Sequence, residues 1–365
     1  MATPWVCGAA PHVREALQQP GQVHRQAIAR YDVPAQRQTI KNESDASAEY
    51  CSRSPCDDFG GPLTDPRLAR RFVKGPFLGE ECCEVDLAQA RIAILPCPFD
   101  GTTTYKKGAD RGPEVLLSAT PQLEPFDLEI EGYPFEVGVT TLPAVKFEND
   151  DPAEAVRRIQ AAADHAVQGG KIVLGLGGEH SISIGLTRAL RSHRGSFSVL
   201  QIDAHADLRD QYEGSPFNHA CVMHTIAEDD RDAAIVSVGI RACCEQEVLY
   251  ARERGIHQFL GHRIARDRGW IEEALSRLKS PLYVTFDLDG LDPSILPSTG
   301  TPVPGGLSWF DTLELLQRAG SRFEVIGADI NELKPDPVNH HSEFLAAQLL
   351  YKMIAYFWWR PQRPQ

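Results

Sequence analysis

A chain of 365 residues with 42% hydrophobic content is long enough to bury a large core, and its formal net charge of −13 disfavours polyanionic partners. We therefore expect no binding to nucleic acid or to an anionic membrane surface, whereas a small cation would be attracted. The longest apolar run, residues 344–359, is broken by Gln348 and Lys352, so the sequence predicts no membrane span.

The N-terminal region and the cysteines bear on where the protein resides. Residues 1–40 contain arginines but no apolar core of the secretory kind, which predicts no signal peptide and leaves an organelle transit peptide as the weaker alternative. The nine cysteines are odd in number and resemble no disulfide framework. We therefore expect reduced thiols and a cytoplasmic protein.

Residues 1–85 are rich in Pro, Gln, Ser and charged side chains, and they show no sustained hydrophobic period. This composition is typical of an N-terminal extension or arm. The remaining residues, 86–365, are expected to form one domain.

From Arg91 onward, short aliphatic runs alternate with helical patterns, and this alternation is typical of a parallel α/β sheet. The predicted strands cover residues 92–95, 172–176, 198–202, 235–238, 282–286 and 325–328. The predicted helices lie near residues 152–168, 181–193, 245–254, 270–279, 308–319 and 342–357. We expect a three-layer α/β/α fold with a mainly parallel sheet.

Carboxylates and imidazoles follow three of these strands directly. In open α/β sheets, ligands bind outside the carboxyl ends of the strands, so these positions are the candidates for chemistry. Residues two apart in an extended chain point to one side, and we expect the side chains to meet there. The candidates, four carboxylates and two imidazoles, are His180, Asp203, His205, Asp207, Asp287 and Asp289.

Four buried carboxylates repel one another unless cations neutralise them, and two divalent metals would balance their charge. Oxygen and nitrogen ligands without thiolate favour Mn²⁺, with Ni²⁺, Co²⁺ and Fe²⁺ as alternatives. Such a pair would acidify water, and the acidic site would attract a cation such as a guanidinium. Alone, the motif at 203–207 could be a strand-end turn with solvated carboxylates, and the motif at 287–289 could be a helix-capping turn. The run 175–178 could be a phosphate loop, but it lacks the Lys-Ser/Thr of a P-loop.

Three segments together resemble the signatures of the ureohydrolase (arginase/agmatinase) family: Gly-Gly-Glu-His-Ser at 177–181, Asp-Ala-His-Ala-Asp at 203–207 and Thr-Phe-Asp-Leu-Asp-Gly-Leu-Asp-Pro at 285–293. Supporting pieces lie at 98–105, 238–241 and 329–335. The resemblance implies an arginase-like fold and a catalytic domain over 86–365. It also implies hydrolysis of a guanidino compound with release of urea, and a homotrimer or homohexamer.

The resemblance also implies roles for the metal-site candidates. One metal would be held by His180, Asp203, Asp207 and Asp287, and the other by Asp203, His205, Asp287 and Asp289. Asp203 and Asp287 would then bridge two Mn²⁺ ions.

Two further residues match functional positions of the family. His219 stands where the family has a proton-shuttling histidine, and Glu332 stands where it has a guanidinium-binding glutamate. Without the resemblance, His219 could be a surface-loop histidine and Glu332 could cap a turn.

The loop after Asp207 is similar to that of agmatinases, because it lacks the Thr/Ser/Asn-rich segment with which arginases receive an amino acid. Asp210 and Glu213 could there receive a second cation, so we expect conversion of agmatine to putrescine and urea. Departures from the family pattern at 108–113 and 218–220 leave other guanidino substrates open: guanidinobutyrate, another guanidino acid, free guanidine or arginine. A catalytically silent regulatory homologue is the remaining alternative.

Overall fold

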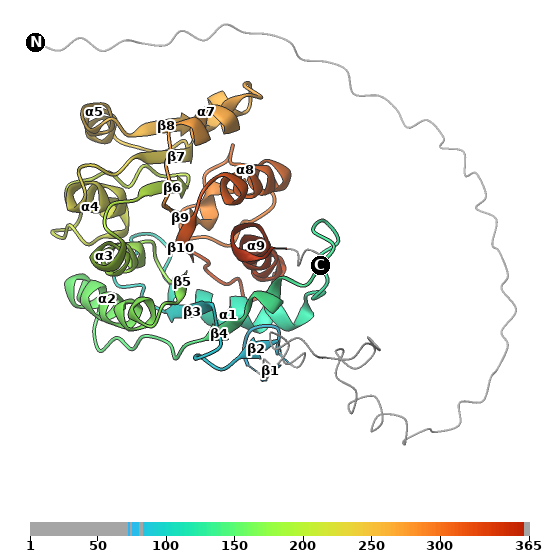
Figure 1. The fold of residues 1–365 in the computed structure, drawn as a ribbon. Helices are drawn as coiled ribbons and strands as arrows, with labels where there is room; N and C mark the ends of the chain where they lie inside the picture. Colours follow the sequence, from blue (N-terminus) through green and yellow to red (C-terminus); the bar gives the residue numbers. More distant parts are fainter. Residues whose placement is uncertain (1–71, 74, 80–82, 361–365) are drawn as a thin grey trace, which may run out of the picture. The chain divides into compact units, whose positions relative to one another are not determined.

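A mainly parallel sheet organises the part of the chain that the computed structural model describes, residues 72–73, 75–79 and 83–360 (Figure 1). In these residues the sheet has ten strands in the order β1-β2-β4-β3-β5-β10-β9-β6-β7-β8. Among the strands that the structure describes, only β1 pairs in antiparallel fashion, with β2. The strands are β1 Phe72–Val73, β2 Glu84–Val85, β3 Ile92–Cys97, β4 Val139–Thr141, β5 Ile172–Gly177, β6 Ser198–Ile202, β7 Ile235–Ile240, β8 His257–Leu260, β9 Leu282–Asp287 and β10 Val325–Asn331.

Helices cover both faces of the sheet. In Figure 1, α2, α3, α4 and α5 lie along one face, and α1, α7, α8 and α9 lie along the other. This arrangement confirms the predicted three-layer α/β/α fold. The helices are α1 Gly112–Ala119, α2 Pro152–Gln168, α3 Ile182–Arg194, α4 Val222–Asp229, α5 Glu245–Arg254, α6 Gly261–Ile264, α7 Trp270–Ser276, α8 Trp309–Arg322 and α9 His341–Trp358.

The central strands are mainly apolar, as expected where both faces of a sheet are covered. On β3, Ile92 and Ile94 belong to the core cluster that includes α8 and α9. Ala93 and Leu95, which point the other way, belong to the cluster that includes α2 and α3. Many of the buried polar side chains lie at or just beyond the carboxyl ends of these strands, where the candidate site lies.

Local signals set the bounds of several helices. Asp151 caps α2 by accepting a hydrogen bond from the backbone N–H of Ala153 at 3.0 Å, and Pro152 occupies the first turn. The apolar run at 344–359 is mostly helix α9, which is buried on nearly every side. No helix in the described ranges has the length and apolar content needed to cross a membrane.

The six predicted strands are all present, and five of them extend one to three residues beyond the predicted ends. The short strands β4 and β8 and the helices α1, α4 and α6 were not predicted. Residues 1–71 lie outside the described residues, so an N-terminal arm there stays a prediction. The described part of the predicted arm supplies β1 and β2, so the sheet begins before residue 86.

Candidate active site

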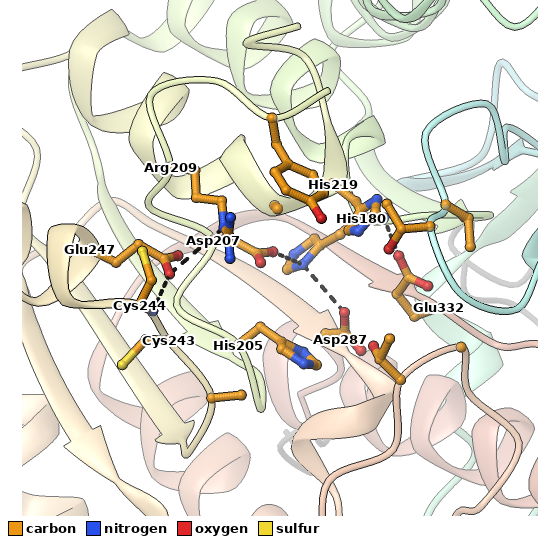
Figure 2. Close-up of a pocket in the computed structure, with 17 residues that line it drawn as sticks. His180, His205, Asp207, Arg209, His219, Cys243, Cys244, Glu247, Asp287 and Glu332 are labelled. Carbon is orange, nitrogen blue, oxygen red and sulfur yellow. Dashed lines mark hydrogen bonds and ion pairs between the residues drawn. The ribbon is translucent and has the colours of Figure 1, made fainter. Parts of the chain in front are cut away.

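The candidate site lies at the carboxyl ends of four neighbouring strands, β5, β10, β9 and β6 (Figure 2). Asp203 follows β6 directly, Glu332 follows β10 directly, and Asp287 is the last residue of β9. His180 comes three residues after β5. Because parallel strands end at the same edge, segments distant in sequence deliver their polar side chains to one place.

The first group of side chains surrounds the imidazole of His180. Its Nδ1 lies near three carboxylate oxygens, at 3.1 Å from Asp203 Oδ2, 3.1 Å from Asp207 Oδ2 and 3.5 Å from Asp287 Oδ2. All four side chains are buried. Three of them, His180, Asp203 and Asp207, offer nitrogen and oxygen donors close enough together to hold a metal ion.

The second group surrounds His205. Its Nδ1 lies 3.0 Å from Asp289 Oδ2 and 3.7 Å from Asp203 Oδ1. These three residues form another set of donors that could hold a metal. Asp203 therefore turns one oxygen toward each imidazole, and the two groups share it. All six sequence candidates thus come together.

Turns rather than continuous extended strands bring these residues together. His205 N donates to Asp203 Oδ1 at 2.6 Å, and Asp289 N donates to Asp287 Oδ1 at 2.8 Å. Asp207 has a left-handed backbone with φ 52°, and Glu332 has φ 66°. The convergence was expected from residues alternating along extended chain, but the structure places Asp289 in a 3₁₀ turn instead.

The ionisation of the cluster shows why cations suit it. Burial, followed by the charge on Asp203, raises the pKa of Asp207 to about 6. Burial, followed by the charges of Asp289 and Asp203, raises the pKa of Asp287 well above its usual value. Since these carboxylates disfavour one another's charge, divalent ions would stabilise the fully ionised site.

The orientation of His180 also fits a metal. Its Nε2 contacts Thr285 Oγ1 at 2.7 Å, whereas its buried Nδ1 has no hydrogen-bond partner in the described part of the chain. A buried nitrogen without such a partner is costly. Here it faces the carboxylate oxygens, where a cation could bind all of them.

His219 lies beside this cluster and is held by two neighbours. Its Nδ1 is 3.3 Å from Glu179 Oε2 and 3.3 Å from Thr102 Oγ1, and its backbone N–H donates to Thr102 Oγ1 at 3.0 Å. Burial lowers the pKa of His219, but the hydrogen bond with Glu179 and nearby acidic charges outweigh burial and raise it to about 9. These interactions favour the protonated imidazole, and Nε2 is left for the pocket.

Glu332 is buried and lines the same pocket. Its Oε1 accepts the backbone N–H of His180 at 2.9 Å, so the two residues are held together. Burial raises the pKa of Glu332 to about 8, although the charge of His219 opposes this shift. A cation bound beside Glu332 would restore its ionised form.

A pocket of about 290 Å³ connects His219 and Glu332 with the two imidazoles of the cluster (Figure 2). Asp210 and Glu213, the expected receivers of a second cation, are exposed and are not among its lining residues. Their neighbours Arg209 and Tyr212 line it instead. The chain reverses here, with paired backbone hydrogen bonds between Tyr212 and Ser215.

Several residues that line or support the pocket had no predicted role. Glu179 belongs to the Gly-Gly-Glu-His-Ser motif and Thr102 to the piece at 98–105, so both stood in recognised segments. Cys243, Cys244 and Glu247 line the pocket from the start of α5. No pattern in the sequence marked this second group, because nothing local indicates that α5 begins at the pocket.

Comparisons with known proteins agree with this geometry. A model of the arginase family matches residues 90–355. The chain is 38% identical to the N(1)-aminopropylagmatine ureohydrolase of Synechocystis sp. over 80% of this chain and 97% of that protein. It is 40% identical to the protein of the same name from Thermus thermophilus, over 73% and 90%.

Solved structures agree as well. The crystal structure of agmatine ureohydrolase of Thermoplasma volcanium superimposes with a TM-score of 0.68 at 29% identity, covering 74% of this chain and 91% of that one. The predicted arginase-like fold is therefore confirmed. With a family match spanning most of the described residues, the chain belongs to the arginase family and is a hydrolase.

Proposed function

We propose that this protein releases urea from a linear guanidino amine of the agmatine class, with N(1)-aminopropylagmatine preferred and agmatine second. The similar proteins from Synechocystis sp. and Thermus thermophilus carry the name of the first activity. A relative from Pyrococcus horikoshii, 35% identical, is named agmatinase. The sequence alone favoured agmatine, and these relatives support the longer amine of the same class.

The observation that carries the chemistry is the pair of histidine and carboxylate groups that share Asp203. We infer that one cation would be held by His180, Asp203, Asp207 and Asp287, and a second by Asp203, His205, Asp287 and Asp289. Mn²⁺ is the proposed metal, with Ni²⁺ or Co²⁺ as alternatives. When bound, two such cations acidify water and so supply a nucleophile at neutral pH.

The chain's own residues would bind the substrate and move a proton. Glu332 Oε2 would accept hydrogen bonds from the guanidinium, since Oε1 is already used by His180. The oxygen of water bonds to the guanidinium carbon, and the C–N bond to the chain amine breaks with its electron pair going to nitrogen. Both protons of the water end on that nitrogen, at least one of them by way of His219 Nε2. The products are urea and a primary ammonium.

The pocket also offers a place for the distal ammonium of the substrate. The guanidinium of Arg209 lies over the Tyr212 ring at 4.5 Å, and its Nε is 4.0 Å from Glu247 Oε2. A position between an aromatic face and a carboxylate attracts cations. We infer that the substrate's distal ammonium displaces Arg209 and takes this position, while its guanidinium lies at Glu332.

Arg209 itself favours a second candidate, an ω-guanidino acid. If Arg209 stays in the pocket, its cation would pair with a distal carboxylate and repel a distal ammonium. A guanidinobutyrase from Pseudomonas aeruginosa is 28% identical to this chain. Arg209 should therefore strengthen the binding of an ω-guanidino acid and weaken the binding of a guanidino amine.

A substrate panel with urea as the readout tests both candidates. We would assay N(1)-aminopropylagmatine, agmatine, guanidinobutyrate, arginine and guanidine with the Mn²⁺-loaded enzyme and with Arg209→Gln. Arg209→Lys, which keeps the charge, is the matched control. We expect the first two substrates to have the highest kcat/KM and to keep or gain activity in Arg209→Gln. Guanidinobutyrate or guanidine as the best substrate would overturn the proposal, and no urea from any member would favour a silent homologue.

Two further expectations belong with this proposal. We infer that the chain forms a homotrimer or homohexamer, which light scattering during gel filtration would measure directly. We also expect a cytoplasmic location, which fractionation of cells would test.

A further inference from the structure

A buried carboxylate outside the proposed ligand set, Asp329, lies behind His180. Its side chain is fully buried, and three donors point to it: the hydroxyl of Tyr283, Thr285 Oγ1 at 2.7 Å and Asn331 Nδ2 at 2.5 Å. Burying a carboxylate is costly unless its oxygens are hydrogen-bonded. Three converging donors match an ionised carboxylate, which can only accept hydrogen bonds.

The sheet register sets this arrangement. Asp329 on β10 lies opposite Thr285 on β9, and opposite Gly175 on β5. A side chain at Gly175 would place its Cβ 2.4 Å from Leu186 Cδ1 and 3.2 Å from Asp329 Cβ, so glycine leaves the room that the carboxylate needs. Along β9, Thr285 shares its face with Asp287, two residues further on. Strand β9 therefore carries the proposed metal ligand Asp287 and also Thr285, which contacts the proposed ligand His180.

Thr285 connects Asp329 to His180. Its hydroxyl has one proton, which it donates to Asp329 Oδ1 at 2.7 Å. Its oxygen lies 2.7 Å from His180 Nε2, and with its proton used it can only accept from that nitrogen. A metal bound through Nδ1 would leave the one proton of the neutral imidazole on Nε2, where Thr285 Oγ1 can accept it.

We propose that Asp329 and Thr285 form a relay that holds His180 in the Nε2–H tautomer and so keeps Nδ1 ready to bind a metal. The inference rests on the ligand role proposed for His180. Asp329 and Thr285 are positioning residues, because neither lines the pocket. Loss of comparable supporting hydrogen bonds lowers metal affinity about 10- to 100-fold in other metalloproteins.

Mn²⁺ affinity measured by calorimetry on the metal-free full chain tests the relay without an activity assay. Thr285→Val removes the hydroxyl and should weaken binding about 10- to 100-fold. Thr285→Ser keeps the hydroxyl and should restore the affinity. Tyr283→Phe removes another donor to Asp329 but leaves Thr285 in place, so it should stay close to wild type. Asp329→Asn should lose less than Thr285→Val, because its amide oxygen can still accept from Thr285.

His180→Ala separates the relay from the ligand proposal. Wild-type affinity in His180→Ala would overturn the ligand role itself. A large loss in His180→Ala together with wild-type affinity in Thr285→Val would overturn the relay and leave the metal site standing. Equal losses in Thr285→Val, Thr285→Ser and Tyr283→Phe would also overturn it, as they would indicate general disruption. If circular dichroism shows that Thr285→Val is unfolded, Thr285→Ala takes its place in the same comparison.

Discussion

Replacement of Asp203 by asparagine is the sharpest test of a shared, two-cation site. Asp203 Oδ2 faces His180 Nδ1 at 3.1 Å, and Oδ1 accepts the backbone N–H of His205 at 2.6 Å. Asparagine keeps the shape and one oxygen but removes the negative charge. Gln201 Nε2 donates to Asp203 Oδ2 at 2.8 Å, and Gln201 Oε1 has no hydrogen-bond partner in the described residues. A flip of the Gln201 amide would let its oxygen accept from the new NH₂ group, but it would lose the hydrogen bond that Nε2 donates to His205 O at 3.2 Å.

The expected magnitude follows from the charge lost. A unit charge about 4 Å from another contributes about 4 kcal/mol at an effective dielectric constant of about 20, and a divalent ion doubles this figure. Part of that energy is recovered because a neutral amide costs less to bury. We therefore expect Asp203→Asn to lose at least about 3 kcal/mol of metal binding, or more than about 100-fold in affinity, and to lose turnover.

The metal-free protein should also lose stability. Burial raises the pKa of Asp203, but interactions with the imidazoles of His180 and His205 outweigh burial and lower it, so metal-free Asp203→Asn should melt at a lower temperature than wild type. Calorimetry with Mn²⁺ and thermal melts with and without chelator measure both effects. The control Asp127→Asn changes a buried carboxylate that pairs with Lys352, and it should leave metal affinity unchanged. Two Mn²⁺ bound at wild-type affinity with normal turnover would refute the reasoning.

Three further outcomes are expected. His219→Ala should lower kcat about 100-fold or more with unchanged metal content, as elemental analysis would show, and loss of metal would contradict a proton-transfer role. Because both side chains are exposed, Asp210→Asn combined with Glu213→Gln should change kcat/KM for agmatine by less than about threefold. A loss above about tenfold would indicate that these two carboxylates do contact the substrate. Burial raises the pKa of Asp292, but hydrogen bonds from Ser294 and nearby backbone N–H groups outweigh it and lower the pKa to about 2. The ionised form therefore stabilises the fold above the unfolded-state pKa of about 3.9, and this contribution is lost as the pH falls toward 2. Asp292→Asn should thus lower Tm by about 2–4 °C at pH 6 and by progressively less toward pH 2. A constant difference in Tm across that range would contradict this assignment.

The metal-site candidates could be predicted because each follows a strongly apolar strand. Buried parallel strands leave a clear signal, and their carboxyl ends must meet at one edge of the sheet. His180 and Asp203 therefore lie at the same edge of the sheet, and the strand order β5-β10-β9-β6 brings them together. The manner of convergence could not be predicted, because the positive φ of Asp207 and the 3₁₀ turn at Asp289 depend on tertiary contacts.

The distal wall of the pocket was much less predictable. Arg209 and Tyr212 face the pocket while Asp210 and Glu213 do not, and no periodicity in a loop fixes this choice. The backbone turns at Glu213, which has φ 48°. The edge strand β8 was missed for a related reason, since its half-exposed residues lack the continuous apolar run of the central strands. Asp329 could have been found from its alternation with Asn331 along a buried strand.

At Asp207 and Glu332, the left-handed backbone makes stability and function favour different residues. A side chain other than glycine at such a φ costs on the order of 1 kcal/mol or more, and glycine would remove that cost at either position. Glycine would also remove a proposed metal ligand or the proposed guanidinium receiver. A screen for heat resistance alone would therefore favour substitutions that inactivate the enzyme, whereas a screen for urea release would retain the strained backbone.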